Sequence, residues 1–340
     1  MAVLIQCQRK RLFKLIINRQ KIYDDIVNQI SIAPLYMLKY PLFVQFKGEI
    51  AVDTGGLKNE MVTILSQYLF VDIQTSIFTL NEDGQYLLTD RCCPQNAFLL
   101  GWLIGKALYH NTVISFNVSN LLLAIMSNNI QFNDIQDYDF QFAKFIQDSE
   151  NYDDVYKEYV DILGTPKLVS QKPRKISLQH AVYTRYFKNS IESIKYLQKG
   201  FMSTFPIPAS YFLNTQLIST IFSTKLISVE DWRTHTIIKC SHEIANIFFN
   251  MLENNETMRS KILKFSTGMS NVPNNSFLWL GKPLFSGEIQ QQFKLESIAS
   301  HLLPMSSTCS FTLKIPIVSS EEILRQRFLI ALECDNLEIP

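Results

Sequence analysis

The stretch Leu303-Pro-Met-Ser-Ser-Thr-Cys-Ser-Phe-Thr-Leu-Lys-Ile-Pro316 decides how the end of this chain folds. Apolar and polar residues alternate in its second half, which predicts a strand over residues 311–318. The first half is rich in small hydroxyl residues and predicts a loop that places Cys309 at the entry to this strand. A cysteine in an exposed loop can reach a partner, but a single cysteine is more often a small buried hydrophobic residue.

Regular elements are predicted on both sides of this stretch. Ser319-Ser-Glu-Glu322 is typical of a capping box, and the apolar residues after it predict a closing helix. Before the stretch, residues 277–280 and 293–295 are short apolar runs that predict strands. Helices combined with a small sheet indicate an α/β or α+β arrangement for this end of the chain.

The rest of the chain is mainly helical in pattern. Strands are predicted near residues 14–18 and 41–46, and helices follow Asp24, Leu57 and Pro94, where apolar residues recur at the helical period. Residues from about 116 to 176 are rich in Asn, Asp, Gln and Tyr between short apolar helices, which indicates a smaller subdomain. The helical pattern lapses at residues 237–241, which indicates a domain boundary there.

The composition excludes several classes of protein. The chain has 340 residues, 47% of them hydrophobic, and a formal net charge of +1. This length predicts two domains with a substantial core. The balanced charge provides no global field to hold nucleic acid or an anionic membrane surface, so such partners would need a local patch. The only candidate is the basic start of the chain, where apolar residues interleave with the basic ones and favour a strand or helix with a solvated face, so no nucleic-acid partner is expected. The longest apolar stretch, residues 97–105, is far shorter than the roughly 20 residues of a membrane-spanning helix, so no membrane span is expected.

The cysteines favour a reducing compartment. Six of them are scattered along a chain that needs no disulfide framework, so we expect a cytoplasmic location, with the nucleus as a second one. Cys92 and Cys93 are adjacent and the five histidines form no helical pair, so no metal site is predicted. His301 precedes Cys309, but a protease-like pair would need an orienting third group, and the sequence shows no signature for one.

Five ordered landmarks carry a resemblance to a known family. They are Phe46-Lys-Gly-Glu-Ile-Ala-Val-Asp-Thr-Gly-Gly56, Lys199-Gly-Phe-Met-Ser-Thr-Phe-Pro-Ile207, Asp231-Trp-Arg-Thr-His-Thr236, Phe265-Ser-Thr-Gly268 with Val272-Pro273 and Phe277, and Leu303-Pro304 with Thr308-Cys309 and Leu313-Lys-Ile-Pro316. In order and spacing they resemble the HECT ubiquitin ligase domain, from about Lys14 to the end of the chain. Five landmarks in sequence are far more specific than any one of them.

The resemblance implies an α+β fold with two lobes joined by a short hinge. A mainly helical N-lobe would cover residues 1–236, the hinge residues 237–241, and a smaller α/β C-lobe residues 242–340. Within the N-lobe, residues 117–176 correspond to the subdomain that docks a ubiquitin-conjugating enzyme. The C-lobe would carry the catalytic cysteine.

The resemblance also implies the chemistry. Cys309 matches the nucleophile that accepts ubiquitin from a conjugating enzyme as a thioester and passes it to a lysine of a protein substrate. The neighbours Thr308, Leu303 and Pro304 would support the loop that carries the thiol. This chemistry requires no cofactor and no metal.

Some positions depart from the family's pattern. The family usually has Phe-Asn after the cysteine, where this chain has Ser310-Phe311, and the family's tyrosine beyond the second proline is Val318 here. Leu337 stands where the family has a phenylalanine that helps to place the acceptor lysine, and Glu338 is a candidate for assisting lysine attack.

The sequence leaves two hypotheses for the function. The first is a ubiquitin-protein transferase of the HECT type. The alternative is a catalytically weakened HECT-like scaffold that binds a conjugating enzyme without efficient transfer. The intact Thr308-Cys309 pair favours the transferase, because a scaffold would have no reason to keep a thiol at this place.

Overall fold

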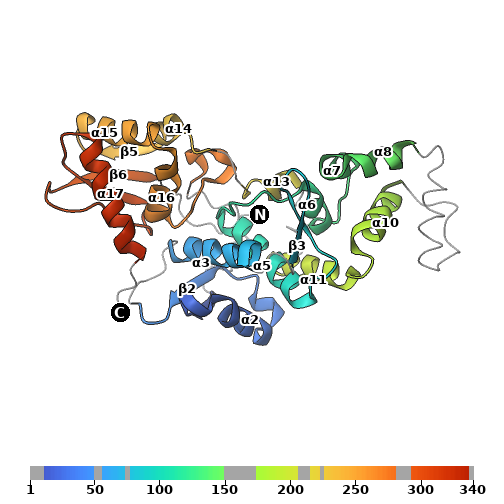
Figure 1. Ribbon diagram of the computed structural model, residues 1–340. Helices are drawn as coiled ribbons and strands as arrows, with labels where there is room; N and C mark the ends of the chain where they lie inside the picture. Colours follow the sequence, from blue (N-terminus) through green and yellow to red (C-terminus); the bar gives the residue numbers. More distant parts are fainter. Residues whose placement is uncertain are drawn as a thin grey trace, which may run out of the picture. The chain divides into compact units, whose positions relative to one another are not determined.

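Figure 1 shows the chain as a computed structural model, in which residues 11–49, 56–72, 77–148, 174–205, 215–222, 226–280 and 292–336 are described. The chain forms two compact units. Unit 1 comprises Met1–Gln67, Lys106–Ser115 and Thr220–Pro340, and unit 2 comprises Tyr68–Gly105 and Phe116–Ser219. Helices combine with small sheets in the described residues, which confirms the predicted α+β class. None of the described helices has the length and apolar character needed to cross a membrane.

Unit 2 is built mainly of helices. They are the larger part of α5 (Pro94–His110), α6 (Asn120–Met126), α7 (Phe132–Tyr138), α8 (Phe140–Asp148), α10 (Arg174–Phe187), α11 (Ile191–Met202) and α13 (Thr215–Ser219). A short antiparallel pair, β3 (Phe78–Leu80) and β4 (Tyr86–Leu88), precedes α5. Phe70, in the helical turn η3 (Tyr68–Asp72), stacks on Phe78 and Phe116 at centroid distances of 4.4 and 4.5 Å and ties this pair to the chain that leads into α6.

The N-terminal part of unit 1 confirms the predicted strand-helix-strand-helix order. β1 (Phe13–Ile17) pairs in parallel with β2 (Leu42–Phe46), and α2 (Ile22–Ile32) connects them after the short turn η1 (Arg19–Lys21). Alternate residues of β1 are buried, as are Ile22, Ile26 and Ile30 on α2, so each element buries one apolar face. α3 (Gly56–Gln67) packs against β2 and α2.

The C-terminal part of unit 1 holds a sheet of four strands in the order β5-β6-β8-β7. They are β5 (Thr236–Lys239), β6 (Phe293–Ile298), β7 (Met305–Ser307) and β8 (Thr312–Pro316), and β7 runs antiparallel to its neighbour β8 while the other pairs are parallel. The helices of this body are α14 (Val229–Thr234), α15 (His242–Glu253), α16 (Glu256–Thr267) and α17 (Glu321–Asn336), visible around the sheet in Figure 1. The closing helix is confirmed, with Ser320 capping it through the N–H of Ile323.

One sequence-based expectation for this body needs correction. The strand predicted at 277–280 is wrong, because residues Phe277–Trp279 form the 3-10 turn η5, capped by Ser276. Residues 237–241, where a hinge is expected, contain most of β5 and Ser241, which caps α15, and the hinge itself stays a prediction. β5 pairs with β6 from Thr236 opposite Phe293, so this segment belongs to the sheet.

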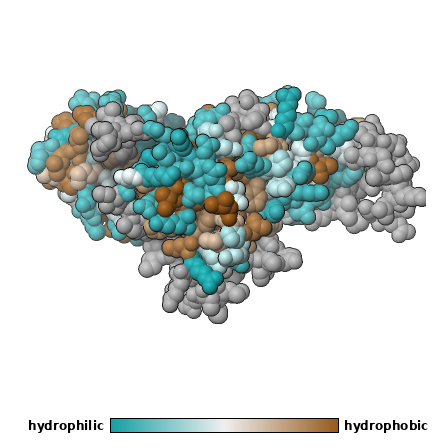
Figure 2. Space-filling view, turned by 90° about the horizontal axis from the view of Figure 1, so that it is seen from below, coloured by the Kyte–Doolittle hydropathy of each residue, from teal (hydrophilic) through white to brown (hydrophobic). Residues whose placement is uncertain are grey.

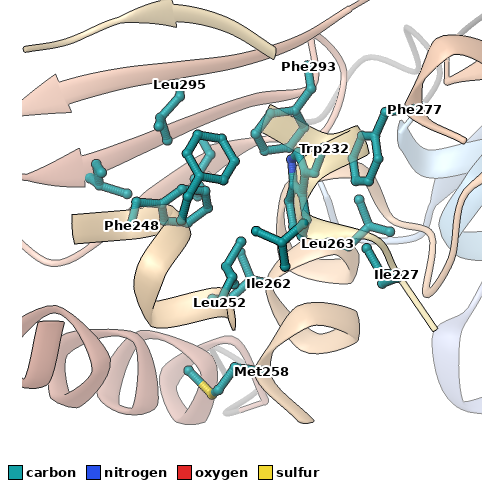
Figure 3. Close-up of a cluster of buried hydrophobic side chains, with 14 of the residues drawn as sticks. Ile227, Trp232, Phe248, Leu252, Met258, Ile262, Leu263, Phe277, Phe293 and Leu295 are labelled. Carbon is teal, nitrogen blue, oxygen red and sulfur yellow. The ribbon is translucent and has the colours of Figure 1, made fainter. Parts of the chain in front are cut away.

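The hydrophobic core of this body also includes residues that precede β5 in the chain. Figure 3 shows Trp232 of α14 between the rings of Phe277 and Phe293. The same cluster of buried side chains includes Ile227 and Val229 together with residues of α15, α16, β6 and β8. The core of the body that carries the sheet therefore includes Ile227 and Val229, and the lobe bounds expected from the resemblance stay predictions.

The end of α5 fixes the start of β2 through two buried titratable side chains. Lys106 is fully buried, and its Nζ donates to the carbonyl oxygen of Tyr40 at 2.7 Å. Burial lowers the pKa of Lys106 to about 7. His110, one turn later, accepts a hydrogen bond at Nε2 from the N–H of Leu42 at 3.1 Å. Burial, together with the charges of Lys58 and Lys106, lowers the pKa of His110 well below its ordinary value, so the ring is neutral.

The depressed pKa of Lys106 predicts a pH-dependent stability. Between about 7 and the ordinary value of 10.5, the unfolded chain binds more protons than the folded one, so the free energy of unfolding should rise with pH. Lys106→Met should lose the part of this pH dependence that comes from Lys106. Lys188→Met, which changes an exposed lysine, should keep it. Urea unfolding of the three proteins at pH 7, 8 and 9 measures the slopes, and equal slopes for Lys106→Met and the wild type would contradict the prediction.

Candidate active site around Cys309

Cys309 lies in a tight hairpin turn. The turn covers residues 308–311 and joins the antiparallel strands β7 and β8, in which Ser307 is opposite Thr312. The N–H of Ser310 donates to the carbonyl oxygen of Ser307 at 3.1 Å and closes the turn. The structure therefore places the thiol where the sequence predicts it, in a loop that enters a strand.

Hydroxyl groups on both sides of the thiol hold the turn together. Ser310 Oγ donates to Ser307 Oγ at 3.0 Å and lies 2.8 Å from Thr312 Oγ1. Thr312 Oγ1 also lies 3.3 Å from the carbonyl oxygen of Ser310. These contacts join the last residue of β7, the residue after the thiol and the first residue of β8. The three side chains therefore restrict the backbone on which Cys309 is carried.

The surroundings of the thiol are half open. Thr308, Cys309 and Ser310 are each partly exposed, Pro304 is buried, and Leu303 is exposed at 38%. An apolar rim is thus present on the strand that leads into the turn, where Met305 is 47% exposed. A thiol in such a place can be approached by a large partner without unfolding of the hairpin.

Arg327 of α17 fixes the chain that leads into β7. Its Nη1 donates to the carbonyl oxygens of Ser300 and Leu302, the latter at 3.0 Å. Sequence reasoning missed this residue, because an arginine in the middle of a helix carries no signal for a bond to a distant loop. The contact restrains the segment that includes Leu303 and Pro304.

Phe311 has an unusual backbone conformation directly after the turn. Its φ is +50°, in the left-handed region that aromatic residues rarely adopt. Its side chain is 4% exposed and belongs to the core cluster, and its carbonyl oxygen accepts from the N–H of Lys294 on β6. Burial of the ring offsets the local strain and directs the chain from the thiol turn into β8.

Cys309 differs in its surroundings from the other described cysteines. Among the described residues, Cys92, Cys93, Cys240 and Cys309 are reduced cysteines that form no disulfide. Burial raises the pKa of Cys92 to about 12 and also raises that of Cys240, so both stay protonated. Cys93 is exposed and directly precedes α5. Among the described cysteines, Cys309 combines partial exposure with a hairpin turn held by hydrogen bonds.

The structure leaves part of the predicted site untested. Leu337 and Glu338 lie outside the described residues, so their roles stay predictions. Among the residues with described positions, no group of three or more His, Cys, Asp and Glu side chains is placed to hold a metal ion. Val318, where the family has a tyrosine, is partly buried against the core cluster.

Comparison with known proteins identifies the family. A HECT-domain (ubiquitin-transferase) family model matches residues 63–338, and the chain belongs to this family. Among similar curated proteins is the E3 ubiquitin-protein ligase HACE1 of Danio rerio, which is 25% identical over 95% of this chain and 39% of its own length. Others are RSP5 of Chaetomium thermophilum, at 24% identity over 93% of the chain and 42% of its length, and Nedd-4 of Drosophila melanogaster, at 24% identity over 94% and 35%.

The comparison agrees with the resemblance of the sequence landmarks, but it covers only part of each relative. The chain spans about two fifths of the length of the curated relatives it matches. The geometry of the turn shows what one departure from the family's pattern means for the backbone. Phe311 occupies, with its positive φ, the position where the family usually has Asn, a residue that tolerates the left-handed region.

The strain at Phe311 predicts that a glycine variant is more stable than an alanine variant, the reverse of the usual order in a strand. Phe311→Ala removes the buried ring but keeps a side chain in the left-handed region, and should destabilise the chain by about 3–5 kcal/mol. Phe311→Gly removes the same ring and relieves the strain, so it should be more stable than the alanine variant by about 1 kcal/mol. At an ordinary strand position glycine is the less stable of the two. Urea unfolding measures the free energy of unfolding of both variants. A Phe311→Gly variant less stable than Phe311→Ala would contradict the prediction.

Proposed function

We propose that this chain is a HECT-type ubiquitin-protein transferase that carries ubiquitin on Cys309. It accepts ubiquitin from a ubiquitin-conjugating enzyme as a thioester and passes it to a lysine of a protein substrate. The observation that supports this function most strongly is a partly exposed thiol, held in a hydrogen-bonded hairpin turn, within a chain of the HECT family.

The reaction balances without any further reactant. The Cys309 thiolate attacks the thioester carbonyl on the conjugating enzyme, and the cysteine of that enzyme leaves as a thiolate. The two thioesters have similar energies, so the first transfer is readily reversible. The neutral amine of a substrate lysine then attacks the Cys309 thioester, an isopeptide bond forms, Cys309 leaves as a thiolate, and the amine proton passes to solvent.

We propose that the conjugating enzyme docks on the described part of residues 117–176. In this part, α8 presents Phe140 and Phe145 to solvent, at 63% and 47% exposure. Exposed aromatic side chains on a helix are the type of residue that anchors protein interfaces. The nearby Tyr186 hydroxyl donates to Asp139 at 2.8 Å, a bond that holds the start of α8 against α10. Residues 149–173 of the predicted docking subdomain lie outside the described residues.

The other parts of the proposal rest on the sequence. Leu337 and Glu338 are proposed to assist attack by the acceptor lysine. The six cysteines scattered along the sequence favour a reducing compartment, and a cytoplasmic or nuclear location is proposed on that basis.

The covalent intermediate predicts a thiol-dependent adduct. Incubation with activating enzyme, a conjugating enzyme and ubiquitin should give a ubiquitin adduct on this chain that a reducing agent removes. Cys309→Ser should give a reductant-resistant ester or no adduct, and Cys93→Ser, which changes the exposed thiol before α5, should leave the adduct intact. Non-reducing and reducing gels measure both. A reductant-sensitive adduct of unchanged intensity in Cys309→Ser would place the nucleophile at another cysteine.

The docking proposal predicts that variants of α8 form the thioester poorly at low concentrations of conjugating enzyme and normally at saturating ones. Phe140→Ala with Phe145→Ala should weaken binding of the conjugating enzyme at least about tenfold, a loss of roughly 1.4 kcal/mol, because exposed aromatic anchors are removed. Thioester formation at saturating conjugating enzyme should recover, since Cys309 is unchanged. Ile32→Ala, at a position of unit 1 that is 82% exposed, is the matched control and should bind normally.

Titration of the conjugating enzyme in a thioester assay separates a change in half-saturation from a change in maximal rate. A lowered maximal rate with unchanged half-saturation would contradict docking at α8. Normal binding without any adduct on the wild-type chain would favour the scaffold hypothesis.

A further inference from the structure

Helices α7 and α8 are joined by a single residue, Asp139. Its N–H donates to the carbonyl oxygen of Ile135 at 2.7 Å and ends α7, and α8 begins at the next residue, Phe140. The backbone of Asp139 has φ −142° and ψ 87°, which lies outside the helical region and turns the chain between the two helices. Because no loop separates the helices, the direction in which α8 leaves α7 depends on this residue.

The carboxylate of Asp139 binds both α8 and α10. Oδ1 accepts a hydrogen bond from the N–H of Phe142 at 2.9 Å and caps the first turn of α8. Oδ2 accepts from the hydroxyl of Tyr186 on α10 at 2.8 Å. The guanidinium of Arg185, also on α10, lies 3.8 Å from the same oxygen. One carboxylate therefore ties the N-terminus of α8 to α10.

The ring of Tyr186 is packed between the ends of the two short helices. It meets Tyr138, the last residue of α7, and Phe142 edge-on at centroid distances of 5.7 and 5.8 Å. Because the ring is held on two sides, little conformational entropy is lost when its hydroxyl binds Asp139. Burial and the neighbouring Asp139 raise the pKa of Tyr186 above its ordinary value, so the hydroxyl keeps the proton that it donates.

The helix held in this way carries the two exposed aromatic side chains that are proposed to anchor the conjugating enzyme. Phe140 follows Asp139 directly, and Phe145 lies further along α8. Ala143 and Ile146 of the same helix are buried, so α8 is fixed on one side by packing and at its start by the carboxylate. A change in the direction of α8 would displace both exposed rings together.

We propose that Tyr186 is a positioning residue for docking of the conjugating enzyme, because its hydrogen bond to Asp139 keeps α8 in the orientation in which the exposed aromatic side chains contact that enzyme. The inference rests on the proposed function and deepens it. Chains in which α8 points elsewhere cannot bind, so the apparent dissociation constant rises as the correctly oriented fraction falls. Cys309 belongs to unit 1, so the rate of transfer within a formed complex does not depend on this bond.

Removal of one hydroxyl group tests this role. Tyr186→Phe deletes the bond to Asp139 and keeps the ring against α7 and α8. Tyr183→Phe is the matched control on the same helix, because the Tyr183 hydroxyl accepts from Gln179 at 3.1 Å and from Gln198 of α11 at 3.4 Å. Both variants remove one partly buried hydroxyl from α10, so a loss of overall stability alone would affect them alike.

The measurements are titration of the conjugating enzyme in the thioester assay and hydrogen exchange of the α8 amides. Tyr186→Phe should raise the half-saturating concentration about fivefold at an unchanged maximal rate. This is less than the full contribution of a hydrogen bond to a charged group, because the packed ring still restrains α8. The α8 amides should also exchange faster, since the capping carboxylate is held less firmly. Tyr183→Phe should keep the wild-type half-saturation and the wild-type exchange in α8.

A combined variant shows whether Tyr186 acts through the aromatic side chains of α8. In a chain that already carries Phe140→Ala and Phe145→Ala, Tyr186→Phe should not raise the half-saturating concentration further, because the side chains that it positions are gone. A further fivefold increase in this background would overturn the proposal, since the bond would then act on binding by another route.

A second variant guards against a loss of folding. Asp139→Asn keeps an oxygen for the N–H of Phe142 and turns an amide group toward Tyr186, so it should raise the half-saturating concentration in the same way. Circular dichroism and a melting curve confirm that each variant is folded, and Asp139→Asn decides the matter if Tyr186→Phe is not.

Unchanged half-saturation in Tyr186→Phe would overturn the positioning role, as would an equal rise in Tyr183→Phe or a lowered maximal rate alone. Failure of the proposed function gives a different result. In that case the wild-type chain neither binds the conjugating enzyme nor forms a ubiquitin adduct, while hydrogen exchange in α8 still distinguishes Tyr186→Phe from Tyr183→Phe.

Discussion

Burial of Trp232 is the interaction on which the sheet-bearing body depends. Its side chain is fully buried, stacks on Phe277 at a centroid distance of 4.7 Å, and meets Phe248 and Phe293 edge-on at 6.0 and 5.3 Å. The preceding residue, Asp231, accepts from Ser276 Oγ at 2.9 Å and from the N–H of Phe277 at 2.7 Å. α14 is thereby fixed to η5 and to β6. Because β6 pairs with β8, the position of the thiol turn depends on this packing.

One face of the molecule is mixed in character where its residues are described. On the face shown in Figure 2, hydrophobic side chains gather in small patches between hydrophilic ones. Scattered apolar residues of this kind are ordinary on soluble domains. The apolar residues that bear on the proposed function, Leu303 and Met305 near the thiol and Phe145 on α8, are therefore identified by their neighbours and not by exposure alone.

Elements with a local signal could be predicted from the sequence, and those set by distant contacts could not. β1, β2 and α2 follow from alternation and from the helical period, which are properties of a few neighbouring residues. β5 was not predicted, because four residues are too few to show a period. In addition, Ile237 and Ile238 are both partly exposed, at 38% and 36%, so the strand has no alternation of buried and exposed residues. Its pairing with β6 joins residues far apart in the chain.

The same distinction applies to the site. The loop before residue 311 and the resemblance of the landmarks pointed to Cys309, and both are local features. The bonds of Arg327 to the loop before β7, and that of Tyr186 to Asp139 at the start of α8, depend on tertiary placement that the sequence does not display. The apolar run at 277–280 was misleading because Ser276 and Asp231 bind its backbone N–H groups and turn it into a helical turn.

The parallel pairing of β5, β6 and β8 has a consequence for how the turn that carries Cys309 is positioned during folding. Each parallel neighbour is reached only through a long crossover, so the sheet consists of contacts between distant parts of the chain, and such contacts form slowly. The β7–β8 hairpin is local, but β8 can join the rest of the sheet only by pairing with β6, which lies between β8 and β5. A chain arrested before β8 would leave one edge of β6 unpaired and available to other strands. The turn that carries Cys309 therefore reaches its place in the sheet only when β8 has paired with β6.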